Sequence, residues 1–174
     1  MLKYSELTLK AVLIVLCISG LLYSNSKAER TFSIVRTPAA PDVLEETLID
    51  LRAPKDRISS LNRWIRSASG VTELDPILLA CLFHTESRFR KEAKSEKGYM
   101  GEAQTKRFSQ FSSVNILEGA EILRNKMALS KGDTLEALAR YKGGKDKKEA
   151  QEQAREVMRI YRTQLERRGL WKQG

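Results

Sequence analysis

The chain is poor in the residues on which many metal sites and disulfide scaffolds depend. It contains one His and two Cys among 174 residues. A His-based metal centre is therefore not expected, and two Cys exclude a disulfide-rich scaffold. Hydrophobic residues make up 41% of the chain and charged residues 30%, a balance typical of a folded protein rather than a disordered one. We predict no metal and no cofactor.

Basic residues are in excess. Lys and Arg together number 31 against 22 Asp and Glu, which gives a formal charge of +9. Such a charge favours anionic partners, namely nucleic acid, an acidic membrane surface or an acidic cell-wall polymer, and does not choose among them. The length suits one compact domain with short appendages.

Residues 1–28 differ in composition from the rest of the chain. Two Lys precede an apolar run over residues 11–22, and small residues stand at the end of the segment in Ser26-Lys27-Ala28. This order is typical of a secretory signal peptide, with cleavage predicted after Ala28. The alternative is an uncleaved membrane anchor through residues 7–23, although a full span needs about 20 apolar residues. Both interpretations predict export to the periplasm or cell envelope.

Cleavage would also remove one of the two Cys. Cys17 lies in the apolar run, so Cys81 would remain alone and no intramolecular disulfide could form. Cys81 lies in an apolar stretch and is expected to be a buried, inert thiol. The formal charge after cleavage would be +7, which is still basic.

The remainder carries the pattern of short helices. Residues 29–54 are predicted to be an N-terminal extension with a short helix, and residues 55–174 to be the main domain. Helix starts are predicted by caps and capping boxes, which are Asp42-x-x-Glu45, Asp56, Asp75-Pro76, Asn115-x-x-Glu118 and Asp133-x-x-Glu136. Helix ends are predicted by Pro and Gly, which are Pro54, Gly70, Gly143-Gly144 and Gly169.

Apolar residues at helical spacing predict which faces are buried. They are Leu44, Leu48 and Leu51, then Ile58, Leu61 and Ile65, then Ile116, Ala120, Leu123 and Met127, and finally Ala154, Val157, Tyr161 and Leu165 in a last helix over residues 149–168. The segment Ile77–Glu86 is apolar nearly all round and is expected to be a central buried helix. Residues 88–113 show no helical face, which predicts a long structured loop or a small strand pair.

Glu86 is the leading catalytic candidate. It follows the most apolar helix of the chain, four residues after Leu82 and three after Phe83, so it lies over the same face as core side chains. An apolar surrounding disfavours the charged form of a carboxyl and raises its pKa. A Glu of this kind can hold a proton near neutral pH and donate it to a leaving oxygen.

The sequence that begins at Glu86 resembles a known signature. It runs E-S-R-F-R-K-E-A-K-S-E-K-G-Y-M-G-E-A-Q. This is similar to the pattern E-S-x-F-x-P-x-A-x-S-x-x-G-A-x-G-L-M-Q of the lytic transglycosylases of the goose-type lysozyme-like superfamily. The matches, without a gap, are Glu86, Ser87, Phe89, Ala93, Ser95, Gly98, Gly101 and Gln104.

The resemblance extends over residues 58–168. Residues 115–120 resemble the family's N-I-x-x-G-A helix start, and residues 137–144 resemble its A-L-A-x-Y-N-x-G segment. The departures from the pattern are Lys91 for Pro, Tyr99 for a small residue, Glu102-Ala103 for Leu-Met, and Lys142 for Asn. The resemblance implies a mainly α, α+β lysozyme-like fold as a single compact helical domain, with the long loop at its active site.

The resemblance also implies an activity. It predicts an exported peptidoglycan lytic transglycosylase that cleaves the bond between N-acetylmuramic acid and N-acetylglucosamine and leaves a 1,6-anhydro end. Glu86 would be the single acid and base, and Ser87, Gln104 and Tyr141 would contact the substrate. The partner would be the glycan strands of peptidoglycan and not nucleic acid, because no basic-plus-aromatic motif accompanies the charge.

Two alternatives stay open. One is a non-catalytic wall-binding or assembly protein that keeps the fold. The other is a peptidoglycan hydrolase in which Glu102 serves as the second carboxylate that most glycosidases need. We favour the interpretation of Glu102 as a surface substitution, because charged side chains are mostly exposed.

Overall fold

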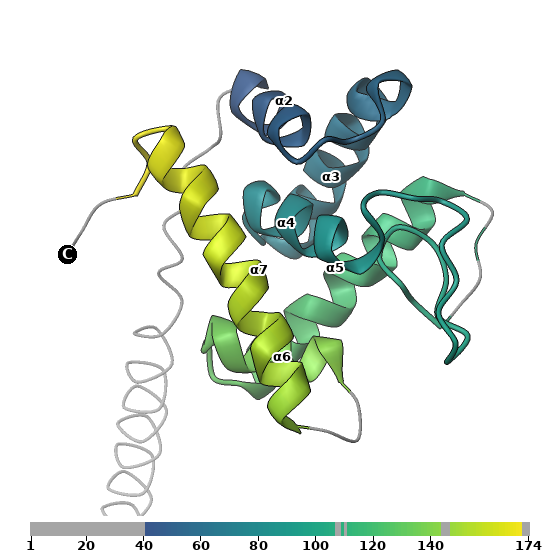
Figure 1. Ribbon diagram of the computed structural model, residues 1–174, viewed down its shortest axis with the longest axis vertical. Coiled ribbons are helices and arrows are strands. Elements are labelled where there is room, and N and C mark those ends of the chain that lie inside the picture. Colours follow the sequence, from purple (N-terminus) through teal and green to yellow (C-terminus); the bar gives the residue numbers. More distant parts are fainter. Residues whose placement is uncertain (1–40, 107–108, 110, 144–146, 172–174) are drawn as a thin grey trace, which may run out of the picture. The chain divides into compact units, whose positions relative to one another are not determined.

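A computed structural model describes residues 41–106, 109, 111–143 and 147–171, all of which lie in the unit Arg36–Gly174 (Figure 1). Within these residues the chain is helical and forms no strand, which confirms the mainly α prediction. The elements are α2 (Pro41–Asp50), the short 3-10 helix η1 (Lys55–Arg57), α3 (Ile58–Thr72), α4 (Pro76–Ser87), α5 (Ser112–Leu129), α6 (Thr134–Lys142) and α7 (Lys147–Arg167).

Helix α4 lies at the centre of this unit, where α2, α3 and α7 pack against it (Figure 1). Helix α5 packs on α3 and α6, and α6 packs on α7. Every residue from Ile77 to Phe83 is at most 2% exposed, as the continuous apolar pattern predicts. The helix begins as expected, because the Asp75 carboxylate accepts hydrogen bonds from the N–H groups of Ile77 and Leu78 at 2.6 and 3.3 Å. Tyr161 of α7 donates to the same carboxylate at 2.9 Å and so fastens α7 to the start of α4.

The surrounding helices bury one stripe each. The predicted apolar faces of α2, α3, α5 and α7 are confirmed at their central positions, which are Leu44, Leu48, Leu61, Ile65, Ile116, Leu123, Ala154 and Val157. Cys81 is fully buried, and burial raises the pKa of its thiol, as expected for an inert cysteine. Helix α2, in the predicted N-terminal extension, packs on α3 and α4. Three residues predicted on buried faces are only half-buried, namely Ile58, Tyr161 and Leu165.

Several predicted helix boundaries are wrong. Gly70 does not end α3, which continues to Thr72 and ends where Glu73 adopts a left-handed conformation with φ of 62°. Asp56 does not cap α3, because it lies inside η1 and no side chain caps the first turn of α3. Helix α5 begins three residues before Asn115, so the predicted capping box is not formed there. Helix α2 begins at Pro41, and the side chain of Asp42 lies outside the described residues.

The segment between α4 and α5 is the long loop that the sequence predicts. The alternative of a strand pair is wrong for its described part, where pairing is limited to isolated bridges between Lys94 and Met100 and between Met100 and Thr105. The loop has a few backbone hydrogen bonds of its own, such as the two between Met100 and Thr105, and side chains from the neighbouring helices also hold it.

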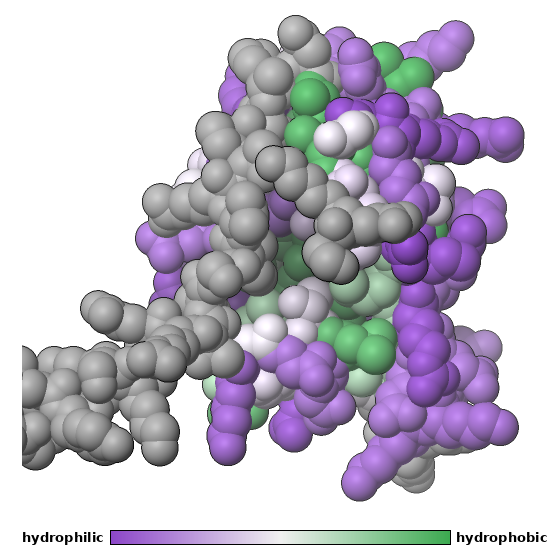
Figure 2. All heavy atoms as spheres, turned by 90° about the vertical axis from the view of Figure 1, so that its left-hand side faces the viewer, coloured by the Kyte–Doolittle hydropathy of each residue, from purple (hydrophilic) through white to green (hydrophobic). Residues whose placement is uncertain are grey.

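No helix within the described part of the chain is long and apolar enough to span a membrane. The predicted signal peptide or anchor, residues 1–28, lies outside the described residues. Where described side chains are visible in Figure 2, hydrophilic ones occupy most of the margins of that face, in keeping with the charged composition.

Candidate active site

The end of α4 is shaped by two consecutive residues in the left-handed conformation. Arg88 and Phe89 have φ of 55° and 61°, and the N–H of Arg88 bonds to the carbonyl of His84 at 2.8 Å. Left-handed backbone is costly for a residue other than Gly and persists where the surroundings hold it in place. Phe89 is fully buried and so anchors the turn. Glu86 consequently lies in the last turn of a buried helix, at the point where the chain turns away.

Glu86 is largely buried and forms an ion pair. Its side chain is 13% exposed, and its Oε1 lies 2.7 Å from Nζ of Lys142, whose side chain is 6% exposed. The Lys142 ammonium also donates to Oγ1 of Thr85 at 2.9 Å. Burial raises the pKa of Glu86, and the adjacent ammonium offsets part of that rise. The carboxyl is therefore tuned in the direction that a proton donor at neutral pH requires.

Tyr141, the second predicted site residue, lies within the electrostatic reach of Glu86. Its hydroxyl donates to the carbonyl of Ala103 at 2.7 Å. Burial, and then the carboxylates of Glu86 and Glu118, raise the pKa of this hydroxyl well above its ordinary value, so Tyr141 is neutral and acts as a hydrogen-bond donor. The structure therefore brings Tyr141 together with the predicted acid.

Ser87 and Gln104, also predicted to contact substrate, make hydrogen bonds to the loop backbone. The Ser87 hydroxyl is buried and donates to the carbonyl of Glu102 at 2.8 Å. The Gln104 amide donates to the carbonyls of Ala93 and Gly101 at 3.1 and 2.9 Å. Gln104 itself has φ of 49°, a strained conformation for its type. These bonds hold the loop segment beside the end of α4.

Asn115 fixes the same loop segment from the side of α5. Its Oδ1 accepts from the N–H of Ala103 at 2.8 Å, and its Nδ2 donates to the carbonyl of Met100 at 3.0 Å and to Oγ1 of Thr105 at 2.9 Å. A Cβ on Gly101 would lie 2.6 Å from the amide of Asn115, and Gly101 has φ of 79°. Both the close approach and the backbone conformation require Gly at this position. Asn115 therefore holds the loop instead of capping a helix.

Glu102 is not a surface substitution. It is 1% exposed, and its carboxylate forms a short ion pair with Arg57 of η1. The same guanidinium donates to the carbonyl of Phe89 at 2.6 Å and to Oγ of Ser112 at 3.0 Å. Burial of a carboxylate is tolerated because an Arg presents several donors to it in fixed geometry. Arg57 thus ties η1, the end of α4, the loop and the start of α5 together.

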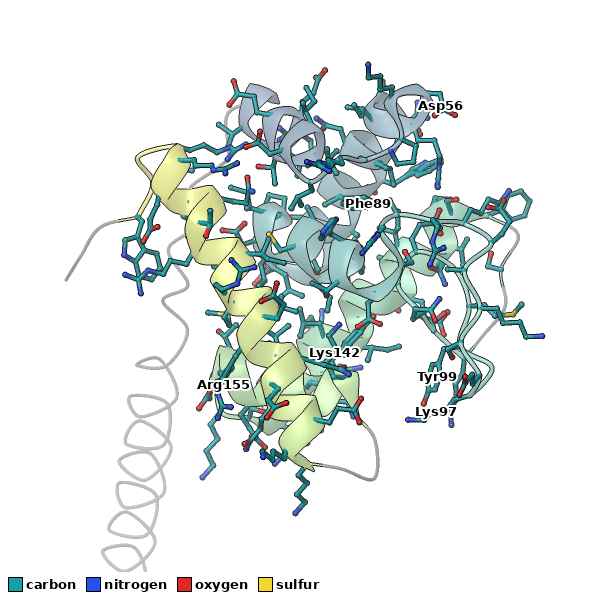
Figure 3. The ribbon with its side chains drawn as sticks, in the orientation of Figure 1. Asp56, Phe89, Lys97, Tyr99, Lys142 and Arg155 are labelled. Atoms are coloured by element: carbon teal, nitrogen blue, oxygen red, sulfur yellow. The ribbon has the colours of Figure 1, made fainter. Side chains whose placement is uncertain are left out.

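The functional arrangement includes residues that the sequence did not single out for a role. In the sequence Lys142 stands out only as a departure from the family pattern, and its pairing with Glu86 depends on where the end of α6 lies in the fold. Figure 3 places Lys142 toward the interior of the unit, whereas Lys97 and Tyr99 lie at the tip of the loop. Thr85 and Arg57 gave no signal, because ordinary polar residues on helices are mostly solvent-facing.

Comparison with protein-family models, with curated proteins and with solved structures finds no match. Within the described ranges, no group of three or more His, Cys, Asp or Glu side chains is placed to hold a metal ion. At the junction of α4, α6 and the loop, the site combines a buried carboxyl, an ammonium and a neutral phenol.

Proposed function

We propose that this protein is an exported peptidoglycan lytic transglycosylase with a lysozyme-like catalytic domain. The observation that carries the proposal is the state of Glu86, a largely buried carboxyl whose pKa is raised and which lies at the end of a central apolar helix. The resemblance of residues 86–104 to the family signature supports the same residue. The basic composition suits an anionic wall polymer.

The proposed reaction needs one carboxyl that acts twice. Glu86 first donates its proton to the oxygen between N-acetylmuramic acid and N-acetylglucosamine, and the bond from that oxygen to C1 of the muramic acid breaks. The resulting carboxylate then takes the proton of the 6-hydroxyl of the same sugar while the hydroxyl oxygen bonds to C1. The product is a 1,6-anhydro ring, and Glu86 regains its proton.

Glu102 is poorly suited to the role that the hydrolase alternative requires. An inverting glycosidase holds water between two carboxyl groups roughly 6.5–9.5 Å apart, and the second one must accept a proton from that water. The Glu102 carboxylate is engaged by Arg57 and almost completely buried. Its arrangement supports a mechanism with Glu86 alone.

The Lys142 contact is the observation that favours the non-catalytic alternative. A buried carboxylate neutralised by an ammonium can be a purely structural pair, and a wall-binding protein would not need Glu86 to release a proton. The two functions differ in whether product forms, so a direct assay separates them.

The test is digestion of purified peptidoglycan, followed by mass analysis of the soluble fragments. Wild type is expected to release anhydro-muropeptides. Glu86→Gln keeps the shape of the side chain without an ionisable proton and is expected to lower the rate about 100- to 10,000-fold, the usual contribution of general acid–base catalysis. Glu96→Gln is the matched control, because Glu96 is exposed in the loop and its loss should not change the rate.

Product mass decides among the alternatives. Fragments heavier by one water would identify a hydrolase. Binding of peptidoglycan without any release would identify a wall-binding protein. A Glu86→Gln variant with near wild-type rate would remove Glu86 from the mechanism.

A further inference from the structure

The pairing of Glu86 with Lys142 carries an inference about how the acid works. The Lys142 ammonium is held in place by Thr85, which accepts from it at 2.9 Å while donating its own hydroxyl proton to the carbonyl of Leu82 at 2.8 Å. The ammonium is thus fixed by the backbone of α4, the helix that carries Glu86. With Nζ 2.7 Å from Oε1, it is a close counter-ion to the carboxylate.

We propose that Lys142 is a positioning residue of the proposed reaction, which holds Oε1 of Glu86 and stabilises the carboxylate that forms when Glu86 gives its proton to the leaving oxygen. The inference rests on the proposed function. The effect is asymmetric over the two steps, because a counter-ion that favours the carboxylate assists proton donation and opposes the return of the proton. Lys142 therefore makes Glu86 a stronger acid and a weaker base.

The other charged groups around this helix end are directed elsewhere. They are His84 of α4, Arg88 directly after α4, Glu118 of α5, Glu156 of α7 and Glu102 of the loop. His84 responds to Arg88 and Glu156, and Glu118 acts on the hydroxyl of Tyr141. Among the charged side chains of the described residues, the one that shifts the pKa of Glu86 is Lys142, whose ammonium lowers it against the rise caused by burial.

Removing the ammonium is expected to raise the pKa of Glu86. The active form of the acid is protonated, so activity is lost as the pH rises through the pKa of Glu86. An opposite charge within about 4–6 Å lowers a carboxyl pKa by roughly 1–3 units. Lys142→Met removes that charge, so the alkaline limb of kcat/KM should move upward by about one to three pH units. On the acid plateau, where Glu86 is protonated in both proteins, Lys142→Met should be the slower enzyme, because its acid is weaker.

The experiment is a pair of titrations on the full chain. One records the pH profile of product release from peptidoglycan. The other follows the 13C resonance of the Glu86 carboxyl in the protein alone, assigned by its loss in Glu86→Gln. Lys142→Arg keeps the charge and should restore most of the wild-type profile. Lys97→Met removes a Lys from the exposed loop tip and should move neither titration (Figure 3).

The outcomes separate this inference from the proposed function. Absence of product from wild type at every pH overturns the proposed function. The inference alone is overturned if wild type is active but the alkaline limb and the Glu86 titration of Lys142→Met stay at their wild-type pH. It is also overturned if Lys142→Met loses rate by the same factor at all pH values. If Lys142→Met does not fold, Thr85→Val is the second test, because it retains the ammonium and removes the hydroxyl that holds it in place. It should then move the Glu86 titration upward by a smaller amount, and an unmoved titration contradicts the inference.

Discussion

The ion pair between Arg57 and Glu102 predicts an unequal response to mutation of its two members. Arg57→Met would leave the Glu102 carboxylate, which is 1% exposed, without its cation. The second oxygen, Oε2, already has no hydrogen-bond partner among the described residues. Removing one partner of a buried pair typically costs about 3–5 kcal/mol, because the remaining charge is uncompensated. Arg57→Met also loses the bonds to Phe89 and Ser112.

The reverse change should cost less. Glu102→Leu leaves Arg57, whose side chain is 19% exposed and can turn its guanidinium toward water. The double variant has neither charge. Replacing a buried pair by apolar residues is often neutral or stabilising, so the double variant should be more stable than Arg57→Met by at least about 2 kcal/mol.

Urea unfolding followed by circular dichroism measures these differences as shifts of the midpoint at constant slope. A loss of about 3–5 kcal/mol corresponds to a lowering of Tm by roughly 6–20 °C for a chain of this size. The reasoning is refuted if Arg57→Met loses less than about 1 kcal/mol, or if the double variant is no more stable than Arg57→Met.

Two further predictions concern packing and export. Gly119→Ala should destabilise the protein by about 1–3 kcal/mol, because the added Cβ would lie 2.4 Å from Cβ of Ala103 and 3.0 Å from the Tyr141 hydroxyl. Gly70→Ala is the control, because a Cβ added at Gly70 in α3 would have no atom within 4 Å, and it should stabilise the protein by about 0.4–1 kcal/mol. If the two variants have the same unfolding midpoint in urea as wild type, both predictions are contradicted. Export is tested by N-terminal sequencing of envelope and cytosolic fractions. A chain that starts after Ala28 in the envelope is expected, and one that starts at Met1 in the cytosol would refute export.

The helical fold was predictable because local signals and burial agree in most of the chain. The Asp75-Pro76 start, the continuous apolar run of α4 and the spaced apolar residues of α2 and α5 specify one arrangement of buried faces. Boundaries failed where tertiary contacts replaced local signals. Asn115 has the sequence pattern of a helix cap, yet its side-chain amide forms three hydrogen bonds to the loop instead. Gly70 is exposed in α3, so nothing required the helix to end there.

The candidate site was predictable only in part, for a physical reason. The position of Glu86 follows from its own helix, because three- and four-residue spacing places it over buried side chains. The partners of Glu86 and Glu102 come from segments 56 and 45 residues away, and no helical or strand period relates such positions. Pairing at that distance depends on how α6 and η1 pack, which is set by the whole core.

The contacts of the loop between α4 and α5 limit where the chain can accept insertions. Its segment 101–105 receives side chains from α4, α5, α6 and η1, namely Ser87, Asn115, Tyr141 and Arg57. An inserted residue there would move every later contact out of register at once. The loop tip near Lys97 has exposed residues and few such bonds, so an insertion there lengthens the loop without shifting segment 101–105. Homologous chains should therefore vary in length at the tip and keep the length of segment 101–105.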